Sequence, residues 1–271
     1  MTIRTRNRFI KVLFIFSTVL FFLTQAILIF SLINHSLNFD YFNQYIKQAF
    51  ILIRYNPYCV LISLFFLNFY VSCVSYILYR SFENTPAAEA IYVCLYLIAC
   101  LANCSRVFIV LFNIAGTFSQ FLMACGNIIL FSKILYPVAL LFIAMMPVIE
   151  QKQDSDRNVF LLLILCIFFA EIIPLNTVHT MPNFGIDYGY SSLLNIVCLI
   201  SIVSGIVIMF IKNKKRLQNQ KTTIGYSLTA IGITFNFNTI NLLQLIIGII
   251  FLSLGSYFFF YELHKQYLWN D

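Results

Sequence analysis

Apolar residues in this chain gather into long runs that short polar segments separate. A helix that crosses a bilayer needs about 20 predominantly apolar residues. Eight runs approach or exceed that length and predict membrane-spanning helices at residues 12–33, 59–79, 87–112, 117–147, 158–176, 190–211, 222–236 and 239–262. The seventh run is short and rich in glycine and threonine, so a chain with seven spans is the alternative.

The composition supports the same fold class. Hydrophobic residues make up 61% of the 271 residues and charged residues only 10%, whereas soluble domains carry about 25% charged residues. The basic start "MTIRTRNRFIK" leads into a run too long for a cleavable signal, so we expect it to be retained as the first span. The sequence therefore predicts an all-α, polytopic membrane helix bundle that forms one integral membrane domain over residues 1–271.

The basic residues predict the orientation. With a cytoplasmic N-terminus and eight spans, only Lys47 and Arg54 fall on the outer side, and Arg106 and Lys133 fall inside spans. The other thirteen of the 17 basic residues fall on the inner side: Arg4, Arg6, Arg8, Lys11, Arg80, Lys152, Arg157, Lys212, Lys214, Lys215, Arg216, Lys221 and Lys265. Membrane proteins keep positive charge in their cytoplasmic loops, so both termini are expected in the cytoplasm.

The same clusters bear on partners. Basic residues in short loop clusters are typical of membrane topology and not of nucleic-acid binding, so the bilayer itself is the expected partner. The basic loop Lys212–Lys221 would face anionic lipid or a cytoplasmic protein partner, or serve only as a topology signal. In the outer segment 34–58, Phe42, Ile46, Ala49, Phe50 and Ile53 recur at helical spacing and predict an amphipathic helix lying at the interface.

The third predicted span carries a polar stripe. Its members follow one another at intervals of three or four residues, which places them on one helix face: Glu89, Tyr92, Tyr96, Ala99, Asn103 and Arg106. Polar groups that face lipid are expensive. The stripe is therefore expected to face other helices or a cavity.

Arg106 needs compensation inside the membrane, because an arginine at a span centre costs about 2.5–3.5 kcal/mol on insertion scales. Glu171 is the charged residue of the fifth span, and both side chains should lie on the order of 8–9 Å below the outer boundary. We therefore expect an Arg106–Glu171 pair. Two interpretations remain open for it, a structural ion pair and a polar pocket for a ligand or ion.

Further polar residues fall inside other spans. Lys133 lies near the middle of the fourth span with Asn127 close by, and Asn68 belongs to a polar stripe of the second span. Intramembrane ionisable groups are functional candidates, although small and polar residues also serve as packing between helices. The candidate pocket residues are Arg106, Glu171, Lys133, Asn103, Tyr96, Tyr92, Asn127 and Asn68.

Motifs for catalysis or metal binding are missing from the sequence. The eight cysteines lie in or beside apolar runs and form no CxxC or Cys/His cluster, so no metal or other cofactor is expected. The chain also contains no HExxH, GxSxG or glycine-rich phosphate loop. We therefore expect a protein that is not an enzyme.

Two stretches of the chain are "TPAAEAIYVCLYLIACLANCSR" (85–106) and "GSYFFFYELHKQYLW" (255–269), which cover about a seventh of it. Both resemble segments of uncharacterised multi-span inner-membrane proteins of spirochaetes. In that group an acidic residue stands three positions before the arginine, whereas Asn103 stands there in this chain. The resemblance implies a protein of the bacterial cytoplasmic membrane and implies no activity.

These observations favour a receptor or sensor that binds a ligand in a polar pocket near the outer half of the membrane. A small anion transporter or proton-coupled transporter is the alternative, with Arg106, Lys133 and Glu171 along the route. An intramembrane enzyme is the second alternative. The absence of duplicated halves favours the sensor, and the short seventh span favours the transporter.

Overall fold

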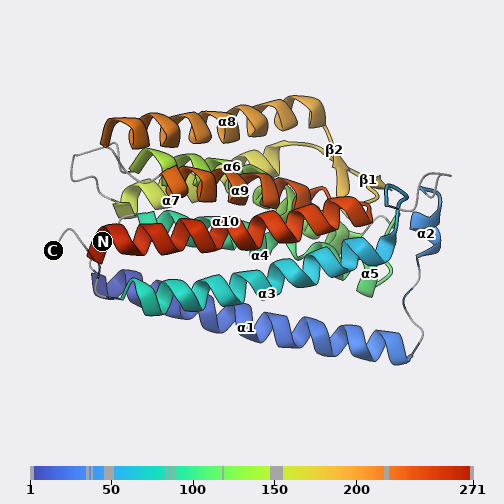
Figure 1. Cartoon of the computed structure of the whole chain (residues 1–271). Helices are drawn as coiled ribbons and strands as arrows, with labels where there is room; N and C mark the ends of the chain where they lie inside the picture. Colours follow the sequence, from blue (N-terminus) through green and yellow to red (C-terminus); the bar gives the residue numbers. More distant parts are fainter. Residues whose placement is uncertain are drawn as a thin grey trace.

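The computed structural model describes residues 3–34, 37, 39–45, 52–83, 85, 87, 89–117, 119–146, 155–216 and 220–268. In this part of the chain, long helices run back and forth along one axis, and both termini lie at the same end of the bundle (Figure 1). The long helices are α1 (Ile3–Ile33), α3 (Pro57–Ser81), α4 (Glu89–Asn103) with its continuation α5 (Arg106–Leu111), α6 (Gln120–Met145), α7 (Ser155–Ile172), α8 (Ser191–Arg216), α9 (Gln220–Phe237) and α10 (Leu242–Leu268).

The chain is a polytopic membrane protein. Among the described residues, six helices are long and apolar enough to cross a membrane: Ile3–Ile33, Pro57–Ser81, Glu89–Leu111, Gln120–Met145, Ser191–Lys212 and Leu242–Lys265. The other two predicted spans correspond to α7 and α9. α7 is apolar but carries three charged residues, Asp156, Arg157 and Glu171, and α9 is rich in threonine, so neither is among the six.

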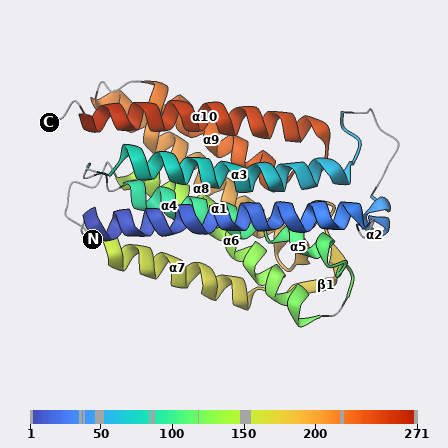
Figure 2. The same ribbon diagram turned by 90° about the horizontal axis from the view of Figure 1, so that it is seen from below.

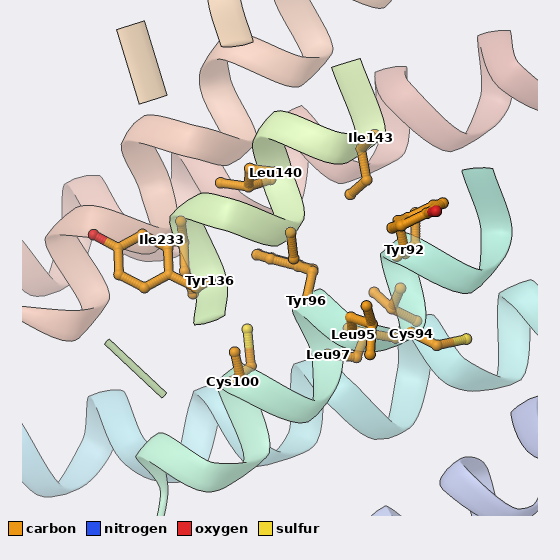
Figure 3. Close-up of a cluster of buried hydrophobic side chains, with 14 of the residues drawn as sticks. Tyr92, Cys94, Leu95, Tyr96, Leu97, Cys100, Tyr136, Leu140, Ile143 and Ile233 are labelled. Carbon is orange, nitrogen blue, oxygen red and sulfur yellow. The ribbon is translucent and has the colours of Figure 1, made fainter. Parts of the chain in front are cut away.

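α4 occupies the centre of the bundle. It packs on α6 and contacts α1, α3 and α7, whereas α1 and α8 expose much of their surface. Figure 3 shows side chains of α4 and α6 filling the space between the two helices, with Tyr92 and Tyr96 among them. Every member of the predicted stripe is buried, which confirms that this face is turned away from lipid.

α9 is accommodated by close contact with α10. A Cβ atom at Gly232 would lie 2.4 Å from the backbone nitrogen of Leu252, and one at Gly255 would lie 2.4 Å from the backbone nitrogen of Thr229. Because the two backbones touch at these glycines, side chains such as Thr229 and Asn236 are buried between helices. A helix of low hydropathy can therefore remain inside the bundle.

A β-hairpin at the opposite end from the termini departs from the all-α prediction. β1 (Leu175–Thr180) pairs antiparallel with β2 (Ile186–Tyr188), so the predicted fifth span, 158–176, ends as a helix at Ile172. Figures 1 and 2 place β1 at the same end as α2 (Asp40–Asn43) and α5, and this end is called the hairpin end below. One isolated bridge between Tyr55 and Asn241 closes it further, with backbone hydrogen bonds from Asn56 N to the carbonyl of Ile240 (3.1 Å) and from Leu243 N to that of Leu52 (3.1 Å).

The predicted amphipathic helix over 34–58 is wrong in the described part. Before α3 begins at Pro57, only the single turn α2 is helical there, and residues 52–54 form turns and a bend. Phe42 is buried against Phe184 of the hairpin at 4.7 Å between ring centroids, so it does not lie in the interface. Ile46, Ala49 and Phe50 lie outside the described residues.

The predicted basic loop Lys212–Lys221 is largely helical. α8 continues to Arg216 and α9 begins at Gln220, which leaves residues 217–219, outside the described part, as the connection. Lys212 is buried, so at this position the surface predicted for lipid or a partner is not available.

Candidate functional site

Arg106 lies at a break in the central helix. The backbone nitrogens of Cys104 and Ser105 bond to the carbonyls of Leu101 and Ala102, both at 3.1 Å, and Val107 bonds to Cys104 at 3.0 Å. These three-residue steps form a tight 3₁₀-like stretch, a feature that often marks a functional hinge. The break separates α4 from α5 and places Arg106 at the first position of α5.

A backbone carbonyl binds the guanidinium. Arg106 Nη1 donates to the carbonyl oxygen of Phe237 at 2.7 Å, and the guanidinium carbon lies 5.9 Å from the centroid of the Phe237 ring. Phe237 is the last residue of α9. Carbonyls in a final helical turn have no partner within the helix and lie at the negative end of its dipole. The end of α9 therefore supplies the negative potential that the sequence analysis assigned to a carboxylate.

The expected Arg106–Glu171 pair is not formed. Glu171 Oε2 accepts a hydrogen bond from Asn127 Nδ2 at 3.0 Å on the exposed side of the bundle. α6 packs against both α4 and α7, so the side chain that Glu171 meets comes from α6. Equal depth in two helices does not make them neighbours, which is the reason for the error.

The hairpin reaches the same carbonyl. Asn183 Nδ2 donates to the Phe237 oxygen at 3.2 Å, while Asn183 Oδ1 accepts from the backbone nitrogen of Gly185 at 3.2 Å. One carbonyl thus receives Arg106 from the central helix and Asn183 from the hairpin turn. This shared acceptor fixes the hairpin over the break in the central helix.

Lys133 is the second cation of the site. Its ammonium donates to the hydroxyl of Tyr188, and its Nζ lies 4.8 Å from the centroid of the Tyr188 ring. Lys133 is mid-helix in α6, but Tyr188 comes only three residues before α8 begins. The carbonyl of Lys133 accepts from the thiol of Cys198, seven residues into α8, at 3.5 Å, so its backbone lies mid-helix while its side chain extends toward the hairpin.

Tyr188 bonds to Lys133 and interacts electrostatically with Arg106. Burial raises the pKa of Tyr188 to about 12, and the charge of Arg106 opposes that rise. The hydroxyl therefore keeps its proton at neutral pH. It can accept from Lys133 while its own hydrogen remains available to an anion.

The charge balance of the site is positive. The electrostatic interactions of Arg106 are with Tyr188, Cys104 and Tyr136, and those of Lys133 are with Arg106 and Cys198. Asp187, the acidic residue next to Tyr188 in the chain, accepts a hydrogen bond from the backbone nitrogen of Tyr188 at 3.0 Å. Neither cation is thus neutralised by a carboxylate in the described part of the chain.

Several buried polar atoms at and beside Arg106 have no hydrogen-bond partner among the residues that the structure describes. They are Arg106 Nε, the Ser105 hydroxyl and both amide atoms of Asn103. Arg106 is only 4% exposed and Asn103 0% exposed. Unpaired buried donors are costly, and they are typical of sites that bind a ligand or ordered water.

The other predicted residues lie elsewhere. Tyr92 stacks on Phe142 at 5.5 Å, and Tyr96 is buried between α4 and α6. Asn68 donates to Thr24 of α1 at 3.3 Å, which makes it part of the α1–α3 interface. Asn127 belongs to the exposed bond with Glu171.

The sequence analysis missed Asn183, Tyr188 and the carbonyl of Phe237. A signal for the hairpin was available, since "PNFG" (182–185) has turn residues and the flanking segments favour strands. No sequence signal identifies one particular carbonyl as an arginine acceptor. Among the described residues, no group of three or more His, Cys, Asp or Glu side chains could hold a metal ion.

Comparisons with protein-family models, curated proteins and solved structures give no match for this chain. The resemblance to spirochaete membrane proteins therefore stays a prediction from the sequence.

Proposed function

We propose that this chain is a non-enzymatic membrane receptor that binds a small anion between Arg106 and Lys133. The observation that supports it is the hydrogen bond of the partly buried Lys133 to Tyr188, which also interacts electrostatically with the buried Arg106. Uncompensated buried charge is unfavourable unless something binds to it. An anion would accept from Lys133, from Tyr188 and from Arg106 Nε.

The orientation of the site follows from the charge distribution. The positive-inside rule places both termini in the cytoplasm, and therefore the hairpin end on the outer side. α7 and α9 have 18 residues each, a length of about 27 Å, close to the hydrocarbon thickness of about 30 Å. We infer that both cross the membrane, which gives eight spans and an anion site in the outer half.

An anion transporter is the second candidate, and the break between α4 and α5 favours it. Interrupted helices are typical of transporters, in which the interruption lies at the substrate site. Arg106 is the residue immediately after this break. Coupling to protons is less favoured than in the sequence analysis, because Glu171 bonds to Asn127 and not to either cation.

The test measures thermal unfolding of the purified full chain with increasing phosphate, sulfate, nitrate or acetate at constant ionic strength. We expect one class of anion to raise the unfolding temperature until the effect reaches a plateau at high anion concentration. Lys133→Gln should weaken that effect at least ten-fold, because it removes the cation that meets Tyr188. Lys221→Gln removes an exposed lysine at the other end of the bundle and should behave as the wild type.

Two results would contradict the proposal. One is the absence of a saturable response to any of these anions, and the other is an equal response in Lys133→Gln and Lys221→Gln. If anions bind, flux into vesicles that contain the protein separates the two candidates. The transporter requires anion movement that Lys133→Gln abolishes, whereas the receptor requires none.

A further inference from the structure

A groove runs along the outside of the bundle between α7 and α8. Its volume is about 770 Å³, within the range of about 300–1,000 Å³ typical of ligand sites. Ile134, Val138 and Phe142 of α6 form its floor, with Leu165 of α7 and Val197 of α8 on its two sides. The residues that line it are almost entirely apolar, so its occupant must be a hydrocarbon.

The groove is open to the bilayer and long. Leu165 is 53% exposed and Leu193 is 62% exposed, as expected of side chains that meet lipid. On α7 its lining extends from Asn158 to Ile173, a distance of about 22 Å along a helix axis. Half of a hydrocarbon core is about 15 Å, so a lipid tail of full leaflet length fits.

The groove ends beside a cation. Ile134, Ile173 and Leu194 line the groove and also pack against the buried cluster that contains Tyr188. Tyr188 accepts a hydrogen bond from Lys133, which directly precedes Ile134 in the chain. An apolar channel that leads to a lysine and a tyrosine hydroxyl matches an amphiphile with an anionic head.

A second groove provides an internal comparison. It lies between α3 and α10, has a volume of about 430 Å³ and is lined by Phe69, Cys73, Ile77 and their neighbours. Its polar lining consists of hydroxyls, a thiol and His264, with no lysine or arginine among the described residues. This groove has the apolar channel but lacks a permanent cation.

We propose that the groove between α7 and α8 binds one tail of an anionic membrane phospholipid and that Lys133 binds the lipid phosphate. Tyr188 donates its hydroxyl hydrogen to a second phosphate oxygen while it accepts from Lys133. This inference rests on the proposed function, because Lys133 serves both, and it specifies the anion as a lipid head group. We take the occupant to be a lipid because the long, almost entirely apolar lining matches a tail, and Lys133, which precedes the lining residue Ile134, matches an anionic head.

The test is native mass spectrometry of the purified full chain with phosphatidic acid or phosphatidylcholine of identical tails. We expect one phosphatidic acid molecule to bind at least ten-fold more tightly than phosphatidylcholine. Leu165→Trp fills the groove at a lipid-exposed position, so the bundle should still fold, and it should lose this binding. The matched control Ile77→Trp, at a position 42% exposed in the second groove, should keep it. Lys133→Gln should remove the preference for phosphatidic acid.

Three outcomes would overturn the inference: equal binding of the two lipids, equal loss in Leu165→Trp and Ile77→Trp, or a dimer that Leu165→Trp dissociates. Stabilisation by inorganic phosphate separates this failure from a failure of the proposed function. A phosphate response that persists in Leu165→Trp, without lipid preference in the wild type, overturns only the lipid assignment. Loss of both responses in the wild type overturns the anion site itself.

Discussion

Arg106 shows how a guanidinium is held in the bundle by backbone. Its Nη1 bonds to the last carbonyl of α9, and Asn183 bonds to the same oxygen. A helix terminus offers unpaired carbonyls and a partial negative charge. This arrangement leaves the positive charge of the arginine without a negative counter-charge. A carboxylate partner would have neutralised it.

A double-mutant cycle tests this arrangement. Neutralising Arg106 and Glu171 singly and together should give additive changes in the free energy of unfolding, within about 0.3–0.5 kcal/mol, because the two side chains share no partner. The pair Asn127 and Glu171 should show a coupling of about 0.2–1 kcal/mol, as exposed charged contacts do. Coupling of Arg106 to Glu171 above about 1 kcal/mol would contradict the geometry.

Tyr188 supplies the second prediction at this scale. Tyr188→Phe removes the acceptor of a largely buried ammonium and should lower the free energy of unfolding by about 1–3 kcal/mol. Tyr190→Phe makes the same chemical change two residues later, at a side chain that is 73% exposed, and should change it by less than about 0.5 kcal/mol. Equal effects in denaturant unfolding would show that the Lys133–Tyr188 bond contributes nothing.

At the scale of elements, the pairing of α9 with α10 keeps a polar helix inside the membrane. The backbones approach so closely that added carbon atoms at Gly232 and Gly255 would strike backbone atoms of the partner helix. Backbone cannot move aside as a flexible side chain can. Gly232 and Gly255 therefore act as packing residues between α9 and α10.

Gly232→Ala should therefore be strongly destabilising. The new methyl group would lie 2.4 Å from a backbone nitrogen, and overpacking typically costs about 1–3 kcal/mol. Ile231→Ala changes the neighbouring residue, which faces outward on the same helix, and should cost clearly less. Thermal unfolding of the two variants in one detergent checks this, and a wild-type unfolding temperature for Gly232→Ala would contradict the close approach.

At the scale of the whole molecule, the alternation of helices places both termini together and the hairpin at the far end (Figure 1). α7 and α9 are the passes whose composition alone leaves them ambiguous. If either one lay flat on the surface, the hairpin or the C-terminus would change sides. The side of the hairpin therefore tests whether α7 crosses, and the side of the C-terminus relative to the hairpin tests whether α9 crosses.

Cysteine accessibility in intact cells provides the measurement. A single cysteine at His179 in β1, in a background without the eight native cysteines, should react with an impermeant maleimide from outside. A cysteine at Arg80 should react only after the membrane is permeabilised. Labelling of both positions from the same side would contradict the eight-span arrangement.

The sequence by itself determined the membrane bundle, because long apolar runs and a one-sided distribution of basic residues depend only on the solvent that each segment meets. It also determined the buried face of α4, since helical spacing alone puts those side chains together. Only the tertiary structure decided which residues meet that face. The acceptor for Arg106 is a carbonyl that every residue possesses, so no sequence pattern marks it. Whether Glu171 meets Arg106 or Asn127 depends on which helices are neighbours, and depth in the membrane carries no information about that.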